Sequence, residues 1–389
     1  MKYNFDEIVR RDGTNAFKYD QRQAVFGTDD VIPLWVADMD FRTARPVIDA
    51  AEKAAHHGIY GYTVTPERFF KAAAGWQKRR HGREADPALM SWSQGVIASL
   101  AACIELFTPA GGAVLIQPPV YPSFRSTITG CDRRVLESPL TEGDGGWYVD
   151  WADFEDKLRR SDMFILCNPH NPLGMVWNEA DLRRMAELCL QHRVLMISDE
   201  IHCDLLFRGN RHTPVANLSP EIAANTITFF SATKTFNLAG LQASLAVFPN
   251  LRMKQSFDHW WGRWHITFNN PLALPAVTAA FEEGDEWLDQ LLEYLDGNMN
   301  FVAEYCRTRI PKIKTSVPDA TYLMWLDFRG LGLDCDSLRD FLIQKAHIGL
   351  NEGRSFGPGG EGFMRLNAAC PRSVLEQAMK QLEVAVNAL

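Results

Sequence analysis

Short runs of apolar residues recur through the N-terminal and central parts of the chain, and each ends in polar or turn-forming residues. The runs are 113–119, 163–169, 194–200, 226–234 and 243–250. Runs this short and this apolar are typical of strands buried on both faces of a sheet. A helix is predicted over 179–192, because Leu182 and Cys189 fall on one helical face. Strands that alternate with helices predict an α/β fold with a mostly parallel sheet.

The C-terminal part has a different order of elements. The expected helices are 286–309, 336–346 and 372–388, and the expected strands are 321–328 and 363–367. This order is typical of an α+β domain. The loop-rich first 45 residues are expected to join it or to cross the interface between the two domains. The chain is therefore predicted to have a large α/β domain over 46–285 and a smaller α+β domain made of 1–45 and 286–389.

Composition and charge narrow the classes of partner. Of the 389 residues, 46% are hydrophobic and 23% are charged, as in ordinary folded proteins. Forty Lys and Arg against 48 Asp and Glu give a net charge of −8. An acidic chain is poorly suited to nucleic acids or anionic membranes, so neither partner is predicted.

Eight cysteines are spread along the chain, and no two of them form a C-x-x-C pair. This spacing argues against zinc ribbons and thioredoxin-like redox sites, and no metal site is predicted. The N-terminus lacks the apolar segment of a signal peptide, and no apolar run approaches the ~20 residues that span a bilayer. A cytoplasmic protein with reduced thiols is expected.

Side chains able to do chemistry stand where the predicted strands end. They are Tyr121, Asn168, Asn171, Asp199, His202, Ser231, Thr233 and Lys234. Ligands of open α/β sheets bind outside the carboxyl ends of the strands, so these side chains are expected to meet there. The segment 93–99 adds a turn that opens a helix, and helix N-termini bind phosphate well.

One cofactor, pyridoxal 5′-phosphate, makes use of this whole set. Lys234 can form an imine with its aldehyde. Asp199 can keep its pyridine nitrogen protonated, so that the ring accepts electrons from a carbanion. Tyr121 offers an aromatic face, and Asn171 offers a donor for the ring hydroxyl. Taken singly, Lys234 is more simply explained as a surface lysine and Asp199 as a helix cap. Tyr121 could be a packed ring, and Asn171 could belong to a plain turn. Their joint occurrence at strand ends favours the cofactor.

Several motifs resemble those of fold-type I pyridoxal-phosphate enzymes, the class I/II aminotransferase superfamily. The general signature is N-P-x-N-P-x-G at 168–174, D-E at 199–200 and S-x-[ST]-K at 231–234. A narrower set is similar to the MalY/PatB group of cystathionine or cysteine-S-conjugate β-lyases. It includes WVADMDF (35–41), HGIYGYT (57–63), PPVYPSF (118–124), KTFNLAGLQ (234–242) and GPGGEGFMRLNAACPRS (357–373). The resemblance extends over nearly the whole chain and implies the fold of that superfamily.

The resemblance implies a role for each residue around the cofactor. Lys234 is the Schiff-base lysine, Asp199 pairs with the ring nitrogen and Tyr121 stacks on the ring. These three form the predicted catalytic set. Asn171 contacts the ring hydroxyl, and His202 lies beside the ring. The implied phosphate contacts are Gly95, Val96, Ile97, Ser231 and Thr233.

The resemblance also implies how substrate is held. Arg365 clamps the α-carboxylate of an amino acid, a task suited to a planar bidentate guanidinium, and Asn171 and Tyr121 contact the same substrate. Tyr62 matches a tyrosine that reaches the cofactor from the neighbouring subunit. A homodimer with shared active sites is therefore expected.

The chain departs from common aminotransferases at several positions. His202 stands where aminotransferases commonly have a tyrosine, and the lyase group also has histidine there. Gln242 stands where many aminotransferases carry a phosphate-binding arginine. The tryptophan-rich segment 259–270 is interpreted as helix and dimer packing, with a role in the substrate pocket as the alternative.

The implied reaction is α,β-elimination, in which Lys234 removes the α-proton and a thiolate leaves from Cβ. Pyruvate and ammonia are the other products. Transamination is the first alternative, because it shares every step up to loss of that proton. A pyridoxal-phosphate-binding regulator is the second.

Overall fold

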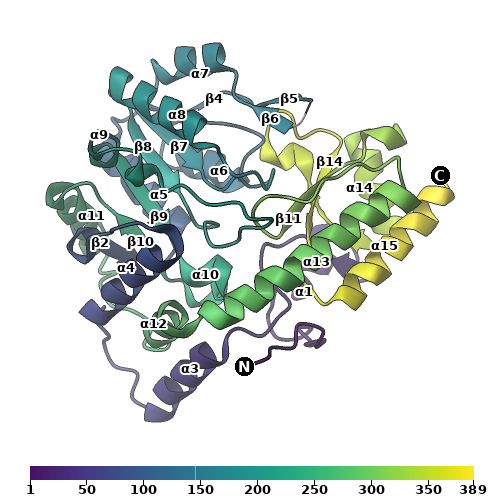
Figure 1. Cartoon of the computed structure of the whole chain (residues 1–389), viewed down its shortest axis with the longest axis horizontal. Helices are drawn as coiled ribbons and strands as arrows, with labels where there is room; N and C mark the ends of the chain where they lie inside the picture. Colours follow the sequence, from purple (N-terminus) through teal and green to yellow (C-terminus); the bar gives the residue numbers. More distant parts are fainter. Residues whose placement is uncertain (145) are drawn as a thin grey trace.

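A seven-stranded sheet lies at the centre of the larger part of the molecule (Figure 1). The computed structural model describes residues 1–144 and 146–389. The sheet has the order β2-β10-β9-β8-β7-β3-β4. Its strands are β2 (Met90–Ser93), β3 (Ala113–Ile116), β4 (Arg134–Glu137), β7 (Met163–Cys167), β8 (Leu195–Asp199), β9 (Thr226–Phe230) and β10 (Ser244–Val247). β10 is antiparallel to both of its neighbours, and the other pairs are parallel. The prediction of an α/β fold with a mostly parallel sheet is confirmed.

Helices cover both faces of this sheet, because its inner strands are apolar on both sides. One layer contains α5 (Val96–Phe107), α6 (Pro122–Gly130) and α11 (Leu251–Arg263), and the other contains α7 (Trp151–Leu158) and α8 (Glu179–His192). On β7, Ile165 packs into the first layer, whereas Phe164 and Leu166 pack into the second. The five apolar runs contain β3, β7, β8, β9 and β10, and α8 covers the predicted helix. The structure adds β2, which alternates polar and apolar residues, and β4, whose residues are partly exposed, so both carry a weaker pattern.

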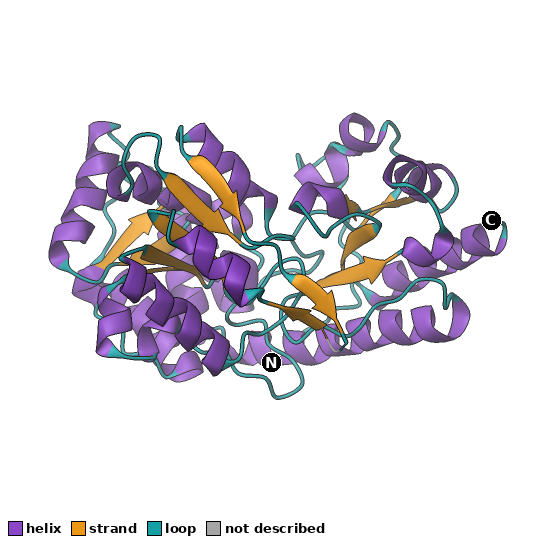
Figure 2. Ribbon diagram, turned by 90° about the horizontal axis from the view of Figure 1, so that it is seen from above, coloured by secondary structure: helices purple, strands orange, loops and turns teal. Residues whose placement is uncertain are grey.

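A second, three-stranded antiparallel sheet has the order β11-β14-β13. The C-terminal elements are α13 (Asp285–Arg309), β11 (Leu323–Asp327), α14 (Cys335–Gln344), β12 (Ile348–Gly349), β13 (Asn351–Glu352), β14 (Phe363–Asn367) and α15 (Arg372–Asn387). The predicted C-terminal helices and strands are thus confirmed. Figure 2 shows the strands in two groups, with loops between them. The exact division of the chain at 45/46 and 285/286 stays a prediction.

Part of the N-terminal segment pairs with the second group of strands. β1 (Ile32–Pro33) pairs with β12, and the amide of Asn367 on β14 donates to the Leu34 carbonyl. The remaining elements are α1 (Phe17–Asp20), α2 (Arg22–Phe26), α3 (Arg45–His57), α4 (Glu67–His81), β5 (Thr141–Gly143), β6 (Gly146–Tyr148), α9 (Pro220–Ala224), α10 (Ala232–Thr235) and α12 (Ala273–Glu283). None of the described helices has both the length and the apolar character needed to cross a membrane.

Candidate active site

The segments that follow β7, β8 and β9 meet at one edge of the large sheet, because these strands are adjacent and parallel. Asp199 ends β8, and its carbonyl accepts the amide of Asn168. The Ser231 hydroxyl begins α10 by accepting the amide of Thr233 at 3.0 Å, and Lys234 lies one residue further on. The structure thus brings together the predicted residues that follow these three strands.

Lys234 points its amine at the backbone of the N-terminal segment. Its Nζ donates to the Ala37 carbonyl at 2.8 Å. Burial and, to a smaller extent, the nearby Arg365 cation lower the pKa of Lys234 to about 8, while Asp38 and Asp199 oppose both effects. The amine therefore has a sizeable neutral fraction near pH 8 and can act as a nucleophile or a base.

The carboxyl of Asp199 is buried, and few hydrogen bonds offset the cost of its burial. Its side chain accepts one hydrogen bond, from the amide of Ile201 at 3.2 Å, among the residues that the structure describes. Burial raises the pKa of Asp199 to about 7, although the Lys234 charge and that hydrogen bond lower it. A cationic N–H placed beside this carboxyl would favour its ionised form.

Arg365 enters the same space from β14. It donates to three neutral acceptors, which are the Asn171 Oδ1 at 3.0 Å, the Trp35 carbonyl at 2.9 Å and the Asn351 Oδ1 at 2.7 Å. Within residues 1–144 and 146–389, no carboxylate forms an ion pair with it. Burial lowers the pKa of Arg365 to about 10, so it stays a cation at neutral pH. A buried cation without an anion is a strong site for a carboxylate ligand.

His202 is buried between these groups. Burial lowers its pKa to about 3, and the Lys234 and Arg365 cations add to that effect, so the imidazole is neutral at physiological pH. Tyr121 precedes α6 and packs edge-to-face on Phe124, with ring centroids 5.7 Å apart. Neutral and aromatic groups therefore line the space between the carboxyl and the cations.

The N-terminus of α5 offers free backbone donors. Gly95 is its N-cap residue, and no side chain caps the helix. The amides of Val96 and Ile97 therefore remain available to an anion. β2, which precedes α5, runs in the same direction as β9, so this helix end lies at the same edge of the sheet as Ser231 and Thr233.

A buried network supports the turn that carries Lys234. Asp204 accepts hydrogen bonds from Thr235 Oγ1 at 2.7 Å and from Trp76 Nε1 at 2.9 Å. His81 also contacts it at 2.6 Å. Cys203 lies within reach of His81 and Asp204, with their potential ligand atoms within 4.8 Å of one another. Because the carboxylate is already satisfied by these donors, the network is read as a structural tie between α4 and α10.

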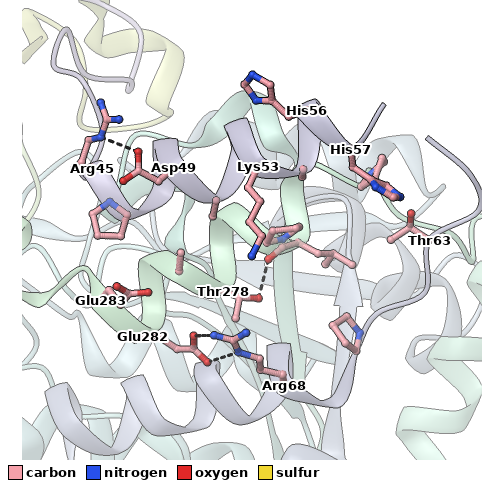
Figure 3. A pocket seen from close by; sticks show the side chains of 18 of the residues that line it. Arg45, Asp49, Lys53, His56, His57, Thr63, Arg68, Thr278, Glu282 and Glu283 are labelled. Atoms are coloured by element: carbon pink, nitrogen blue, oxygen red, sulfur yellow. Dashed lines mark hydrogen bonds and ion pairs between the residues drawn. The ribbon is translucent and has the colours of Figure 1, made fainter. Parts of the chain in front are cut away.

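Tyr62 is not near the other predicted residues within one chain. It is 90% exposed, and its ring lies 4.7 Å from that of Phe268. It lines a cleft of about 1360 Å³ between α3, α4 and α12, whose walls carry charged side chains such as Lys53 and Glu282 (Figure 3). Of the predicted site residues, Tyr62 alone lines this cleft.

The structure adds groups that sequence reasoning missed. The carbonyls of Trp35 and Ala37 accept from Arg365 and Lys234, and the Tyr322 hydroxyl also donates to Ala37. The motif at 35–41 resembles that of the lyase group, but a carbonyl that accepts a hydrogen bond leaves no signature in residue type. In the tryptophan-rich segment, Trp261 is buried against Phe257, whereas Trp264 is 62% exposed. The interpretation of helix packing is supported for Trp261.

Comparisons with known proteins agree over the full length. The family described as "Aminotransferase class I and II" matches residues 29–382. The chain is 40% identical to the cystathionine beta-lyase PatB of Bacillus subtilis, covering 99% of this chain and 100% of that protein. It is 33% identical to protein MalY of Escherichia coli, with complete coverage of both. The crystal structure of cystalysin from Treponema denticola, which contains a pyridoxal 5′-phosphate cofactor, superposes with a TM-score of 0.95 at 31% identity and covers 100% of each chain.

Proposed function

The chain belongs to the class I and II aminotransferase family, and on that basis we propose that it is a pyridoxal-phosphate-dependent carbon–sulfur β-lyase. It cleaves cystathionine or related cysteine S-conjugates to a thiol, pyruvate and ammonia. The full-length similarity to PatB supports the choice of reaction. The observation that carries the site is the buried Arg365 near Lys234, which pairs with no carboxylate among the described residues, because it calls for an amino-acid carboxylate beside a reactive amine.

The residues at the strand ends fit the cofactor. Among the described residues, Asp199 accepts no hydrogen bond from a cationic side chain. Lys234 has a lowered pKa, and no side chain of the described residues caps the N-terminal amides of α5. When bound, pyridoxal phosphate withdraws electrons from the α-carbon of the amino acid. The residues proposed to hold it are Lys234 at the aldehyde, Asp199 at the ring nitrogen, Asn171 at the ring hydroxyl, Tyr121 and His202 around the ring, and Gly95, Val96, Ile97, Ser231 and Thr233 at the phosphate.

The remaining chemistry belongs to the chain itself. Arg365 binds the substrate carboxylate in place of its neutral acceptors, with Asn171 beside it. This fixes the α-carbon near Lys234, whose neutral amine takes the α-proton at Nζ. The neutral His202 adds no charge that would compete for the carboxylate. Burial of Lys234, Asp199 and Arg365 keeps water away from the reacting atoms.

The same proposal includes a homodimer that completes the site. Tyr62 stands among other exposed apolar side chains, namely Ile59, Tyr60, Val64, Trp264 and Phe268. An exposed apolar group of this kind is typical of an interface. We assign it to a second copy of the chain, whose Tyr62 approaches the cofactor. A cytoplasmic location is part of the proposal, because none of the eight cysteines forms a disulfide within the described residues.

Transamination is the second candidate, because the proposed residues serve either reaction up to removal of the α-proton. The test supplies cystathionine and measures pyruvate and free thiol with and without a keto acid. Steady release of both without the keto acid is expected, and Lys234→Ala should abolish it. Strict dependence on the keto acid, with no thiol released, would replace the lyase by an aminotransferase.

A further inference from the structure

The free amine of Lys234 has a defined resting place on the backbone. Ala37 O accepts from Lys234 Nζ at 2.8 Å and from Tyr322 Oη at 2.9 Å. Tyr322 is fully buried, and its hydroxyl makes no other hydrogen bond among the residues that the structure describes. Two donors from different parts of the fold thus converge on one carbonyl.

The segment that carries this carbonyl, residues 34–41, is held on both sides. We call it the crossing segment. Asn367 Nδ2 donates to the carbonyls of Val36 and Asp38, each at 2.6 Å, from β14. Asn237, three residues after Lys234, exchanges hydrogen bonds with the backbone of Met39. The carbonyl of Ala37 is therefore fixed relative to both β14 and the turn that carries Lys234.

Tyr322 is aimed by an unusual backbone. The preceding residue, Thr321, has φ of +68°, a left-handed conformation that β-branched residues rarely adopt. It persists because Thr321 N donates to the Leu205 carbonyl at 2.8 Å and Thr321 Oγ1 accepts the amide of Leu323. Strained residues of this kind cluster at functional sites, and Thr321 directly precedes the residue whose hydroxyl donates to Ala37.

We propose that the Ala37 carbonyl, held in place by the Tyr322 hydroxyl, is the docking position of the Lys234 amine whenever that amine is not bonded to the cofactor. Tyr322 is thus a positioning residue. One N–H of the amine is engaged by the carbonyl, which leaves its lone pair free to take a proton. The inference rests on the proposed role of Lys234 but not on which reaction follows.

The test uses the full chain without cofactor and follows Lys234 by its reductive methylation with formaldehyde and cyanoborohydride, measured by peptide mass spectrometry across pH. The charged and titratable groups around Nζ are Arg365, Asp38, Asp199 and His202, and all stay unchanged in the variant Tyr322→Phe. If the hydroxyl positions the carbonyl, its loss weakens a contact that favours the ammonium. The labelling midpoint of Lys234 should then fall by about half a pH unit or more.

Tyr305→Phe is the matched control, because Tyr305 also donates its hydroxyl but does so to Glu383, a side chain outside the site. It should leave the midpoint unchanged. An unchanged midpoint in Tyr322→Phe would reduce Tyr322 to a packing residue, and a raised midpoint would show that it competes with Lys234 for the carbonyl. Either result overturns the proposal. The labelling test contains no substrate, so its result does not depend on which reaction the enzyme catalyses. A failed lyase assay and a failed labelling test can therefore be told apart.

Discussion

Lys18 and Arg365 are both buried cations, but their surroundings differ. Lys18 lies 2.8 Å from Asp40, which is also paired with Arg11 at 2.7 Å. Arg365 is bonded to three neutral acceptors. A paired buried charge is costly to disturb, because removing one partner leaves the other unsatisfied. A buried cation without an anion costs free energy on folding, and it is available to bind an anionic ligand. The ion-paired Lys18 therefore has a structural role, whereas Arg365 belongs to the candidate active site.

The largest expected effect comes from Arg365→Met. The substrate carboxylate loses its cation, so kcat/KM for cystathionine should fall roughly a hundredfold to a thousandfold. The free energy of unfolding should change by less than about 1 kcal/mol, because removal of an uncompensated charge from the interior offsets the loss of its three hydrogen bonds. Steady-state kinetics and urea unfolding of the same preparation measure both. Arg365→Lys is the control and should retain part of the activity. Loss of stability without loss of activity would contradict the assignment.

The next effect comes from Lys18→Met, which should behave in the opposite way. It leaves Asp40 with one cation instead of two and should lower the free energy of unfolding by about 3 kcal/mol. The activity of the folded protein should stay within about threefold, since Lys18 touches no proposed substrate group. Adding Asp40→Asn to the variant should recover part of the stability. If Lys18→Met and Arg365→Met were equally destabilising, the comparison would fail.

A smaller effect extends the comparison to an anion. The pKa of Asp199 is raised to about 7, so its carboxyl is protonated in the folded, cofactor-free protein at a pH where the unfolded chain would ionise it. Its contribution to stability is full below the ordinary pKa and is lost as the pH rises toward about 7. Relative to Asp199→Asn, the unsubstituted cofactor-free protein should therefore lose about 2 kcal/mol between pH 4 and pH 6. Urea unfolding at several pH values measures this, and a difference independent of pH would show that the carboxyl ionises freely.

The sequence predicts one wall of the site better than the other. Asn171, Asp199 and Lys234 follow apolar strands, and their chemistry depends on side chains, so pattern and residue type locate them together. Arg365 was found through resemblance alone, because a polar residue in the short strand β14 has no telling pattern.

The opposite wall could not be predicted from residue types. Trp35 and Ala37 act through their carbonyls, which every residue possesses. Tyr322 looks like an ordinary strand residue, and the positive φ of Thr321 depends on distant hydrogen bonds. The role of Tyr62 depends on a second chain and stays a prediction.

The crossing segment uses its carbonyls alternately. Trp35 and Ala37 face Arg365 and Lys234, whereas Val36 and Asp38 face Asn367. Function here resides in spacing along the main chain, while burial separately constrains side chains such as Leu34, Met39 and Asp40. Loss or gain of one residue would swap the two sets of carbonyls and disconnect both cations at once. In a lineage or a library of variants, the length of this stretch should therefore stay constant.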